Sequence, residues 1–107
     1  MTQVVGTVLD SNTAATSHNI TVPTGVTTAM TGLFVVGTGS SDSTTITLSR
    51  TGSTFTKLDE RNAANTRVAI FTGANLAAGN TISVTLSSSQ AITVAHYYQD
   101  DYTFTAG

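Results

Sequence analysis

The sequence predicts an all-β fold, a two-sheet antiparallel sandwich of about eight strands. Short segments in which apolar and hydroxyl-bearing side chains alternate recur along the chain, separated by clusters of Gly, Asn, Asp and Ser. Thr and Ser make up about a third of the chain, and β-branched Thr fits a pleated strand better than a helix. No segment carries an apolar stripe of helical period over about ten residues.

The N-terminal part of the chain contains two predicted strands. Residues 4–9 alternate as a first strand, and residues 10–12 (DSN) stop it because their side chains can bond their own backbone. Residues 18–22 form the second strand, which Pro23 and Gly25 end. His18 therefore stands at a strand start.

The middle of the chain contains three more predicted strands. Residues 32–37 (GLFVVG) are a continuous apolar run, as expected for a central strand that is covered on both faces. Residues 44–49 alternate cleanly, whereas residues 54–58 leave the facing of Phe55 ambiguous. Residues 59–65 (DERNAAN) are predicted to be a charged loop, in which we expect salt bridges that also involve Arg67.

The last three strands follow at regular spacing. Residues 67–72 (RVAIFT) are a buried strand, and the glycine-flanked residues 73–80 turn the chain with at most one helical turn. Residues 81–86 alternate most sharply, with Ile, Val and Leu on one face and Thr or Ser on the other. Residues 87–90 are a predicted turn, after which residues 91–98 return as the final core strand.

Residues 1–98 are thus one predicted sandwich domain, and residues 99–107 are a C-terminal tail. The 107 residues match the usual length of a single domain. The tail alternates Tyr102 and Phe104 with threonines, which a free tail seldom needs. We expect it either to dock on its own domain or to add a strand to the edge of a neighbour.

Composition excludes several classes of partner. The net charge is −2 and the four basic residues do not cluster, so a nucleic-acid partner is not expected. No apolar run approaches the ~20 residues that span a bilayer, so no membrane partner is expected either. The chain has no Cys, hence no disulfide framework or thiolate metal site, and no visible secretory signal. We expect a protein made in a cytoplasm.

Residues that could carry chemistry are scattered. The two histidines, His18 and His96, lie far apart without zinc-ligand spacing, and no nucleophile motif accompanies them. Adjacent carboxylates on a strand point to opposite faces and so make no acid/base couple. We expect no enzyme, no catalytic residue, no metal site and no cofactor, with a loop calcium ion near Asp42 or Asp100 as the remaining alternative.

Aromatic residues suggest a contact surface instead. Tyrosine gives large contact area at low entropic cost, which favours an interface. We expect contacts with partners at the tail and the last strand, through His96, Tyr98, Tyr102 and Phe104. For Tyr97, Tyr98 and Tyr102 the alternative to an interface is a sugar platform, although such platforms commonly use Trp and the chain has none.

The stretch from His18 to Tyr98 resembles a group of β-sandwich modules from phage structural proteins and bacterial surface proteins. Residues 18–41 (HNITVPTGVTTAMTGLFVVGTGSS), 45–75 (TITLSRTGSTFTKLDERNAANTRVAIFTGAN) and 80–98 (NTISVTLSSSQAITVAHYY) carry the resemblance. The chain departs from the family at Phe55, where many members have Trp, and at residues 28–32, where an AGD turn is common. The resemblance implies an immunoglobulin-like sandwich, with a jelly roll as the second choice, and no catalytic residues.

This resemblance, with the size of the chain, favours a virion structural protein. The leading expectation is a capsid decoration or cement protein that binds the major capsid protein or another virion protein, forms a homo-oligomer and stabilises the shell. Neutral Thr and Ser faces would limit repulsion between many copies on a lattice. The alternative is a module of a phage tail or fibre, or of a cell surface, that binds a receptor or a glycan.

Overall fold

The computed structural model describes residues 2–39, 43–63, 65–101 and 103–105. Over these residues it consists of strands and turns without a helix, so none of its elements is a helix that could cross a membrane. The strands are β1 (Gln3–Val5), β2 (Leu9–Thr21), β3 (Thr31–Thr38), β4 (Ile46–Ser49), β5 (Thr54–Ala63), β6 (Thr66–Ala74) and β7 (Thr81–Gln99). Every strand pair is antiparallel, which confirms the predicted all-β fold.

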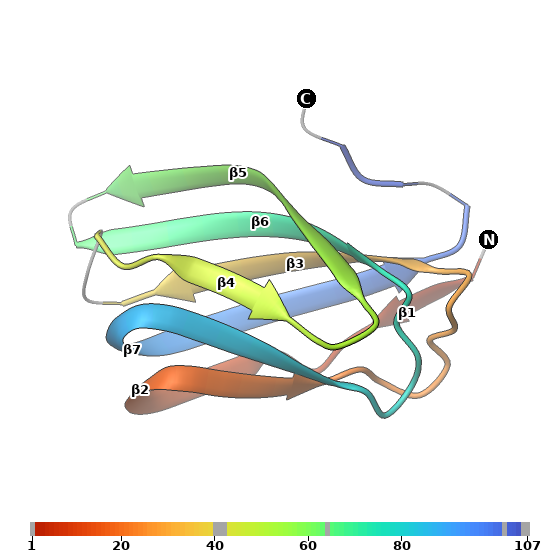
Figure 1. The fold of residues 1–107 in the computed structure, drawn as a ribbon, viewed down its shortest axis with the longest axis horizontal. Helices are drawn as coiled ribbons and strands as arrows, with labels where there is room; N and C mark the ends of the chain where they lie inside the picture. Colours follow the sequence, from red (N-terminus) through yellow and green to blue (C-terminus); the bar gives the residue numbers. More distant parts are fainter. Residues whose placement is uncertain (1, 40–42, 64, 102, 106–107) are drawn as a thin grey trace.

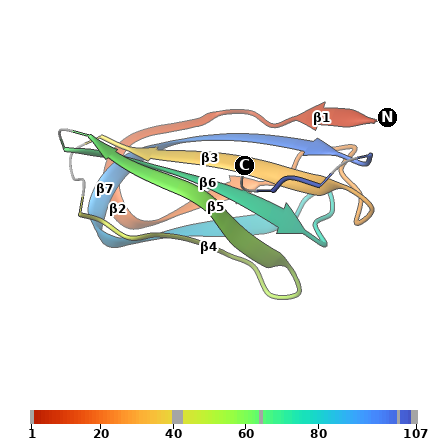
Figure 2. The same cartoon turned by 90° about the horizontal axis from the view of Figure 1, so that it is seen from above.

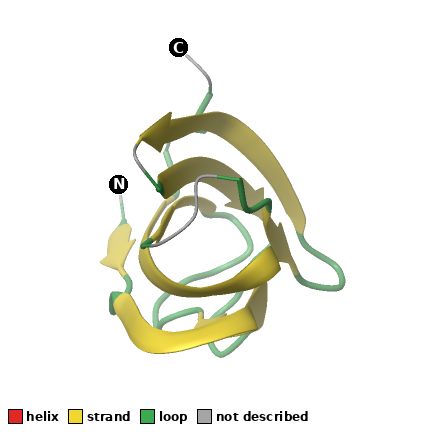
Figure 3. Ribbon diagram, turned by 90° about the vertical axis from the view of Figure 1, so that its left-hand side faces the viewer, coloured by secondary structure: helices red, strands yellow, loops and turns green. Residues whose placement is uncertain are grey.

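Two long strands, β2 and β7, bend and connect two layers (Figures 1 and 3). The second half of β7 lies between β3 and β1, in a layer with the order β1-β7-β3-β6-β5. The first half of β7 lies between β4 and the end of β2, in the opposite layer. One continuous sheet therefore folds back on itself to make the sandwich.

The core lies between these two layers. In the five-stranded layer Phe34, Val36 and Val94 are fully buried, and Ile82 and Val84 of the opposite layer face them. Alternation along each strand places these side chains on one face, and each contributes about 1.5–3 kcal/mol by leaving water. The alternating pattern of residues 81–86 therefore predicted the core face of this part of β7.

The first strand boundary differs from the prediction. β1 ends at Val5, and β2 continues through residues 10–12, where a stop was expected. The backbone of these residues pairs with β7, with Asp10 opposite Thr93 and Ser11 opposite Ile92. Because ladder pairing satisfies the backbone at this exposed edge, the turn-forming side chains do not end the strand. His18 consequently lies inside β2 and not at a strand start.

The predicted charged loop at residues 59–65 is also mostly strand. β5 extends to Ala63 and pairs with β6, with a bulge between Lys57 and Asp59. Charged side chains suit this position because β5 is the edge of its layer and most of its residues are exposed. The expected salt bridges form, with Glu60 Oε1 2.6 Å from Arg67 Nη1 and Arg61 Nε 3.5 Å from Asp59 Oδ2.

The predicted turn at residues 87–90 is a bend within β7, so two of the predicted strands are one. Side chains hold the bend: Thr44 Oγ1 lies 2.6 Å from Ser88 Oγ, and the Thr45 N–H donates to Ser87 Oγ at 2.7 Å. On the other side His18 Nε2 donates to the Gln90 carbonyl at 2.8 Å. The hydrogen bonds of these serines thus stabilise the bend at which β7 passes from one layer to the other.

Candidate protein-binding face

The side of the five-stranded layer that faces away from the core is largely apolar. We call it the outer face and define it by Leu33, Val35, Val68, Ile70, Ala95 and Tyr97. None of these side chains is fully buried, and Val68 is 37% exposed. Large exposed apolar areas are uncommon on monomeric proteins and mark sites of interaction. Figure 2 looks onto this layer from the side of the C-terminal segment.

Strand register assembles the outer face into rows. One row joins Ile70 of β6, Val35 of β3 and Ala95 of β7, which are directly opposite one another. The next row joins Leu33 to Tyr97. Side chains opposite one another on an antiparallel sheet have Cβ atoms about 4.5–5.5 Å apart, so these residues form one contiguous surface.

The sequence already contained the signal for this surface. The continuous apolar run at residues 32–37 predicts a strand covered on both faces. In the structure Phe34 and Val36 face the core and are fully buried, whereas Leu33 and Val35 point outward and are half-buried. Within the described part of the chain, other residues therefore cover the face of β3 that carries Leu33 and Val35 only in part.

The C-terminal segment supplies part of that cover. The Phe104 ring packs edge-on against Tyr97, with centroids 6.2 Å apart and planes at 71°. Phe104 also borders a hollow of about 560 Å³ with Leu33, Leu58 and Ile70. Phe104 of the tail thus contacts its own domain and leaves open space beside its aromatic ring. Addition of the tail to the edge of a neighbour stays a prediction.

Polar residues border the outer face along β5. Asp59 is opposite Ile70 and Arg61 is opposite Val68. Both are exposed, and Lys57 donates to Glu60 Oε2 at 3.0 Å on the same strand. An apolar centre with a charged rim is the usual anatomy of a protein interface.

Two of the four expected contact residues are buried and offer no surface to a partner. Tyr98 is 0% exposed and His96 is 5% exposed. Both side chains point inward because residues 92, 94, 96 and 98 share the core face of β7. Burial raises the pKa of the Tyr98 hydroxyl. The expectation that Tyr98 is exposed is therefore wrong.

The other two expected contact residues belong to the tail. Phe104 is half-buried on the outer face, and Tyr102 lies outside the described residues. Tyr97, for which the sequence leaves an interface or a sugar platform open, is the last-strand tyrosine that reaches the outer face, and its hydroxyl donates to Gln99 Oε1 at 2.9 Å. Because Tyr98 is buried, the two adjacent tyrosines do not form a joint sugar platform.

His96 and His18 have structural partners. His96 Nε2 donates to the Thr7 carbonyl at 2.9 Å, so its Nδ1 accepts the proton of the Tyr98 hydroxyl at 2.7 Å. His18 holds the bend of β7 through the Gln90 carbonyl. Nε2 of each histidine thus holds a backbone carbonyl, and Nδ1 of His96 also holds the Tyr98 hydroxyl.

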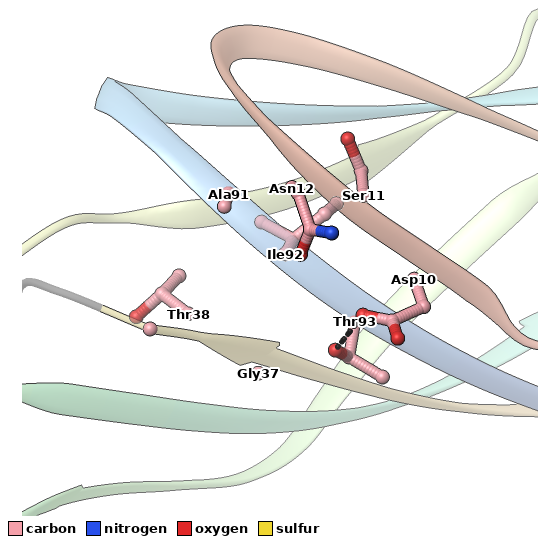
Figure 4. Close-up of a pocket in the computed structure, with 9 residues that line it drawn as sticks. Asp10, Ser11, Asn12, Gly37, Thr38, Ala91, Ile92 and Thr93 are labelled. Carbon is pink, nitrogen blue, oxygen red and sulfur yellow. Dashed lines mark hydrogen bonds between the residues drawn. The ribbon is translucent and has the colours of Figure 1, made fainter.

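A separate hollow of about 290 Å³ lies where β2, β3 and β7 meet (Figure 4). Asp10, Asn12 and Thr38 are among its lining residues, and Thr93 Oγ1 donates to Asp10 Oδ1 at 3.3 Å. Its lining contains one carboxylate, without a histidine or a basic side chain. Such a set contains no acid/base couple.

Metal ligands do not gather in the described ranges. No group of three or more His, Cys, Asp or Glu side chains that could hold an ion occurs there. Asp42, considered for calcium, lies outside the described residues. Asp100 instead accepts the Thr2 backbone N–H at 2.9 Å, and this hydrogen bond lowers the pKa of its carboxyl.

Comparison of the chain with protein-family models, with curated protein sequences and with solved structures finds no match. The geometry of the outer face is therefore the basis of the functional proposal.

Proposed function

We propose that this chain is a non-enzymatic structural protein of a phage particle, which binds the outer surface of the capsid shell and stabilises it. The observation that carries the proposal is the apolar outer face, with Val35 and Ile70 at its centre and a charged rim on β5. The partner in this proposal is the major capsid protein or another virion protein, which presents a matching apolar surface.

The chemistry of the face supports a protein partner over a small molecule. Standard protein interfaces bury about 800 Å² on each side, with an apolar centre and a polar rim. The outer face has this anatomy of aliphatic side chains beside a charged strand, whereas it has few groups that could orient a sugar or a substrate. Arg61 and Asp59 at the rim can set the orientation of the partner while Val35 and Ile70 lose contact with water.

Low charge supports a location on a lattice. Only ten side chains are charged (Lys+Arg 4 plus Asp+Glu 6), and the net charge is −2. Copies that sit close together on a symmetric shell repel one another less when their surfaces are neutral. Many weak contacts on one shell also add to a high total affinity, so a modest face on each copy is sufficient.

The test is binding of the purified chain to expanded capsids of the phage whose genome encodes it, measured by co-sedimentation. Mass spectrometry of intact particles should find the chain in many copies. Val35→Asp places a carboxylate at the centre of the outer face, and we expect at least a tenfold loss of capsid affinity. The side chain points away from the core, so the variant should fold, which circular dichroism can check.

Thr47→Asp is the matched control. Thr47 is exposed on β4 in the opposite layer, and the variant adds the same charge away from the outer face. It should bind capsids as the parent does. Absence of the chain from intact particles, or equal binding by Val35→Asp and Thr47→Asp, would contradict the proposal. Binding to host cells or glycans without binding to capsids would favour the receptor-binding alternative.

A further inference from the structure

We propose that two copies of this chain pair through the N-terminal edge of the five-stranded layer, with residues 3–10 of one copy antiparallel to residues 10–3 of the other. We call this segment the pairing edge. The proposal concerns self-association in solution and is independent of the capsid-binding role proposed above.

The pairing edge is an open side of the sheet. β1 is the last strand in its layer, and both β1 and β2 pair only with β7 among the described strands. Figures 2 and 3 show β1 at the rim of the molecule with no ribbon beyond it. In an antiparallel pair alternate backbone N–H and C=O groups point away from the neighbour, so this edge offers them to another strand.

The two outer edges of this layer differ in charge. β5 has four charged side chains within residues 57–61 and a bulge at Lys57/Asp59, devices by which proteins block edge-to-edge pairing. Residues 2–9 contain no charged side chain. Instead, the pairing edge carries Val5, 74% exposed, and Val8, 53% exposed, which with Val68 are the exposed large hydrophobics of the described residues.

A bulge places these two valines on the same face. Between the pairs Val5–Tyr97 and Leu9–Val94, the pairing edge has three residues (6–8) opposite two in β7 (95 and 96). The extra residue shifts the alternation, so that Val5 and Val8 point outward. Val4 and Leu9 point inward and pack against the core.

This pattern makes the pairing edge complementary to itself. A two-fold axis between Gly6 and Thr7 sets Val5 opposite Val8 of the second copy, both on the outer side. It sets Val4 opposite Leu9, both on the core side. Gln3 then meets Asp10, so the single carboxylate of the edge faces an amide donor and not the carboxylate of the second copy. A second copy is therefore the occupant that this sequence fits.

Pairing of this kind is isologous, which closes the assembly as a dimer. Two three-residue ladders, one on each side of the axis, join the five-stranded layers. Val5 is opposite Tyr97 in its own chain, so the outer faces of the two copies become neighbours across the new seam. The dimer would present a doubled apolar surface.

Charge substitutions test the register. We expect the full chain to be a dimer by light scattering coupled to size exclusion at micromolar concentration. Val5→Lys and Val8→Glu should each weaken the dimer at least tenfold, because each buries a charge against valine. The combined variant, Val5→Lys with Val8→Glu, should restore it, because the introduced ammonium group then faces the introduced carboxylate of the second copy at both sites. Thr85→Lys, exposed in the opposite layer, is the matched control and should stay dimeric.

Cysteine cross-linking measures the same register directly, since the chain has no cysteine of its own. Opposite residues have Cα atoms about 5 Å apart, within disulfide range. A mixture of Val5→Cys and Val8→Cys chains should therefore cross-link on oxidation, whereas either chain alone should not. A parent chain that stays monomeric at millimolar concentration, a dimer that neither single charge weakens, or cross-linking by Val5→Cys alone would each overturn the proposal.

Discussion

The Nδ1 atom of His96 lies 2.7 Å from the hydroxyl of Tyr98, two residues along the same strand, and both side chains are buried. The other ring nitrogen of His96 reaches the Thr7 carbonyl at 2.9 Å. The Phe34 ring lies parallel to the imidazole at 6.3 Å, with planes 9° apart. This cluster fastens the β1–β2 junction to the central strand β7.

Replacing His96 should therefore destabilise the fold. His96→Leu puts an apolar side chain of similar size in place of the ring and leaves the buried Tyr98 hydroxyl and the part-buried Thr7 carbonyl without their partner. Each buried polar group without a hydrogen bond costs about 1–3 kcal/mol. We expect a loss of about 2–4 kcal/mol in the free energy of unfolding, measured by urea denaturation.

Tyr98→Phe is the milder companion of this variant. It removes only the hydroxyl, so one ring nitrogen of His96 loses its partner. The free energy of unfolding should fall by about 1–2 kcal/mol. Equal stability of His96→Leu and the parent chain would show that these hydrogen bonds do not hold the junction.

Gly6 is the second element of this junction. A Cβ atom on Gly6 would overlap the His96 ring. The backbone N–H of Gly6 donates to the His96 carbonyl at 2.9 Å. Two hydrogen bonds fix that ring, so it cannot move aside freely. Gly6→Ala should therefore cost about 1–3 kcal/mol of stability by overpacking. Gly39→Ala is the control, because open space surrounds a Cβ there, and a smaller loss at Gly6 than at Gly39 would refute the steric argument.

The sequence predicts the fold class and most of the strands because alternation reports burial on one face directly. Ile82, Val84 and Leu86 are buried as their spacing predicts. The ends of the strands are harder to predict, because residues 10–12 and 59–63 carry turn-forming or charged side chains that exposed edge strands also tolerate. The local sequence cannot distinguish an edge strand from a loop, because long-range pairing with β7 or β6 determines whether such a segment is a strand.

The same limit applies to the bend in β7 and to the candidate site. Residues 87–90 have the composition of a turn, yet the chain bends there without reversing within one sheet, because Thr44 and His18 brace it from other parts of the chain. Which of the adjacent residues Tyr97 and Tyr98 lies on the surface is clear only once the register is known. Phase along β7 puts Tyr98 in the core and Tyr97 on the outer face, and the sequence signal for this was the apolar row of residues 92 and 94 in phase with residue 98.

The contact between Phe104 and Tyr97 holds the tail on the outer face. Edge-to-face aromatic pairs contribute about 0.5–1.5 kcal/mol beyond burial. Tyr97→Ala should release the tail and raise the rate of chymotryptic cleavage at Phe104 severalfold, with little change in global stability. Mass spectrometry of a timed digest measures this cleavage rate. Thr93→Ala is the control, because Thr93 lies on the same face of β7 but away from the ring contact. An unchanged cleavage rate in Tyr97→Ala would show that the tail is held by other contacts.

The hydrogen bond from the Thr2 N–H to Asp100 joins the start of β1 to the end of β7, and it predicts a pH dependence. Donation by Thr2 favours the ionised carboxylate, so the pKa of Asp100 in the folded chain lies below its ordinary value of 3.8. A lowered pKa in the folded state means that the carboxylate stabilises the fold above 3.8, and that this contribution is lost as pH falls through the lower value. The amide resonance of Thr2 should shift upfield as Asp100 takes up a proton, with an NMR midpoint below 3.8. Asp100→Asn should abolish this transition while Asp10→Asn, on β2, leaves it in place, and a midpoint at or above the ordinary value would show that Thr2 does not hold the carboxylate in solution.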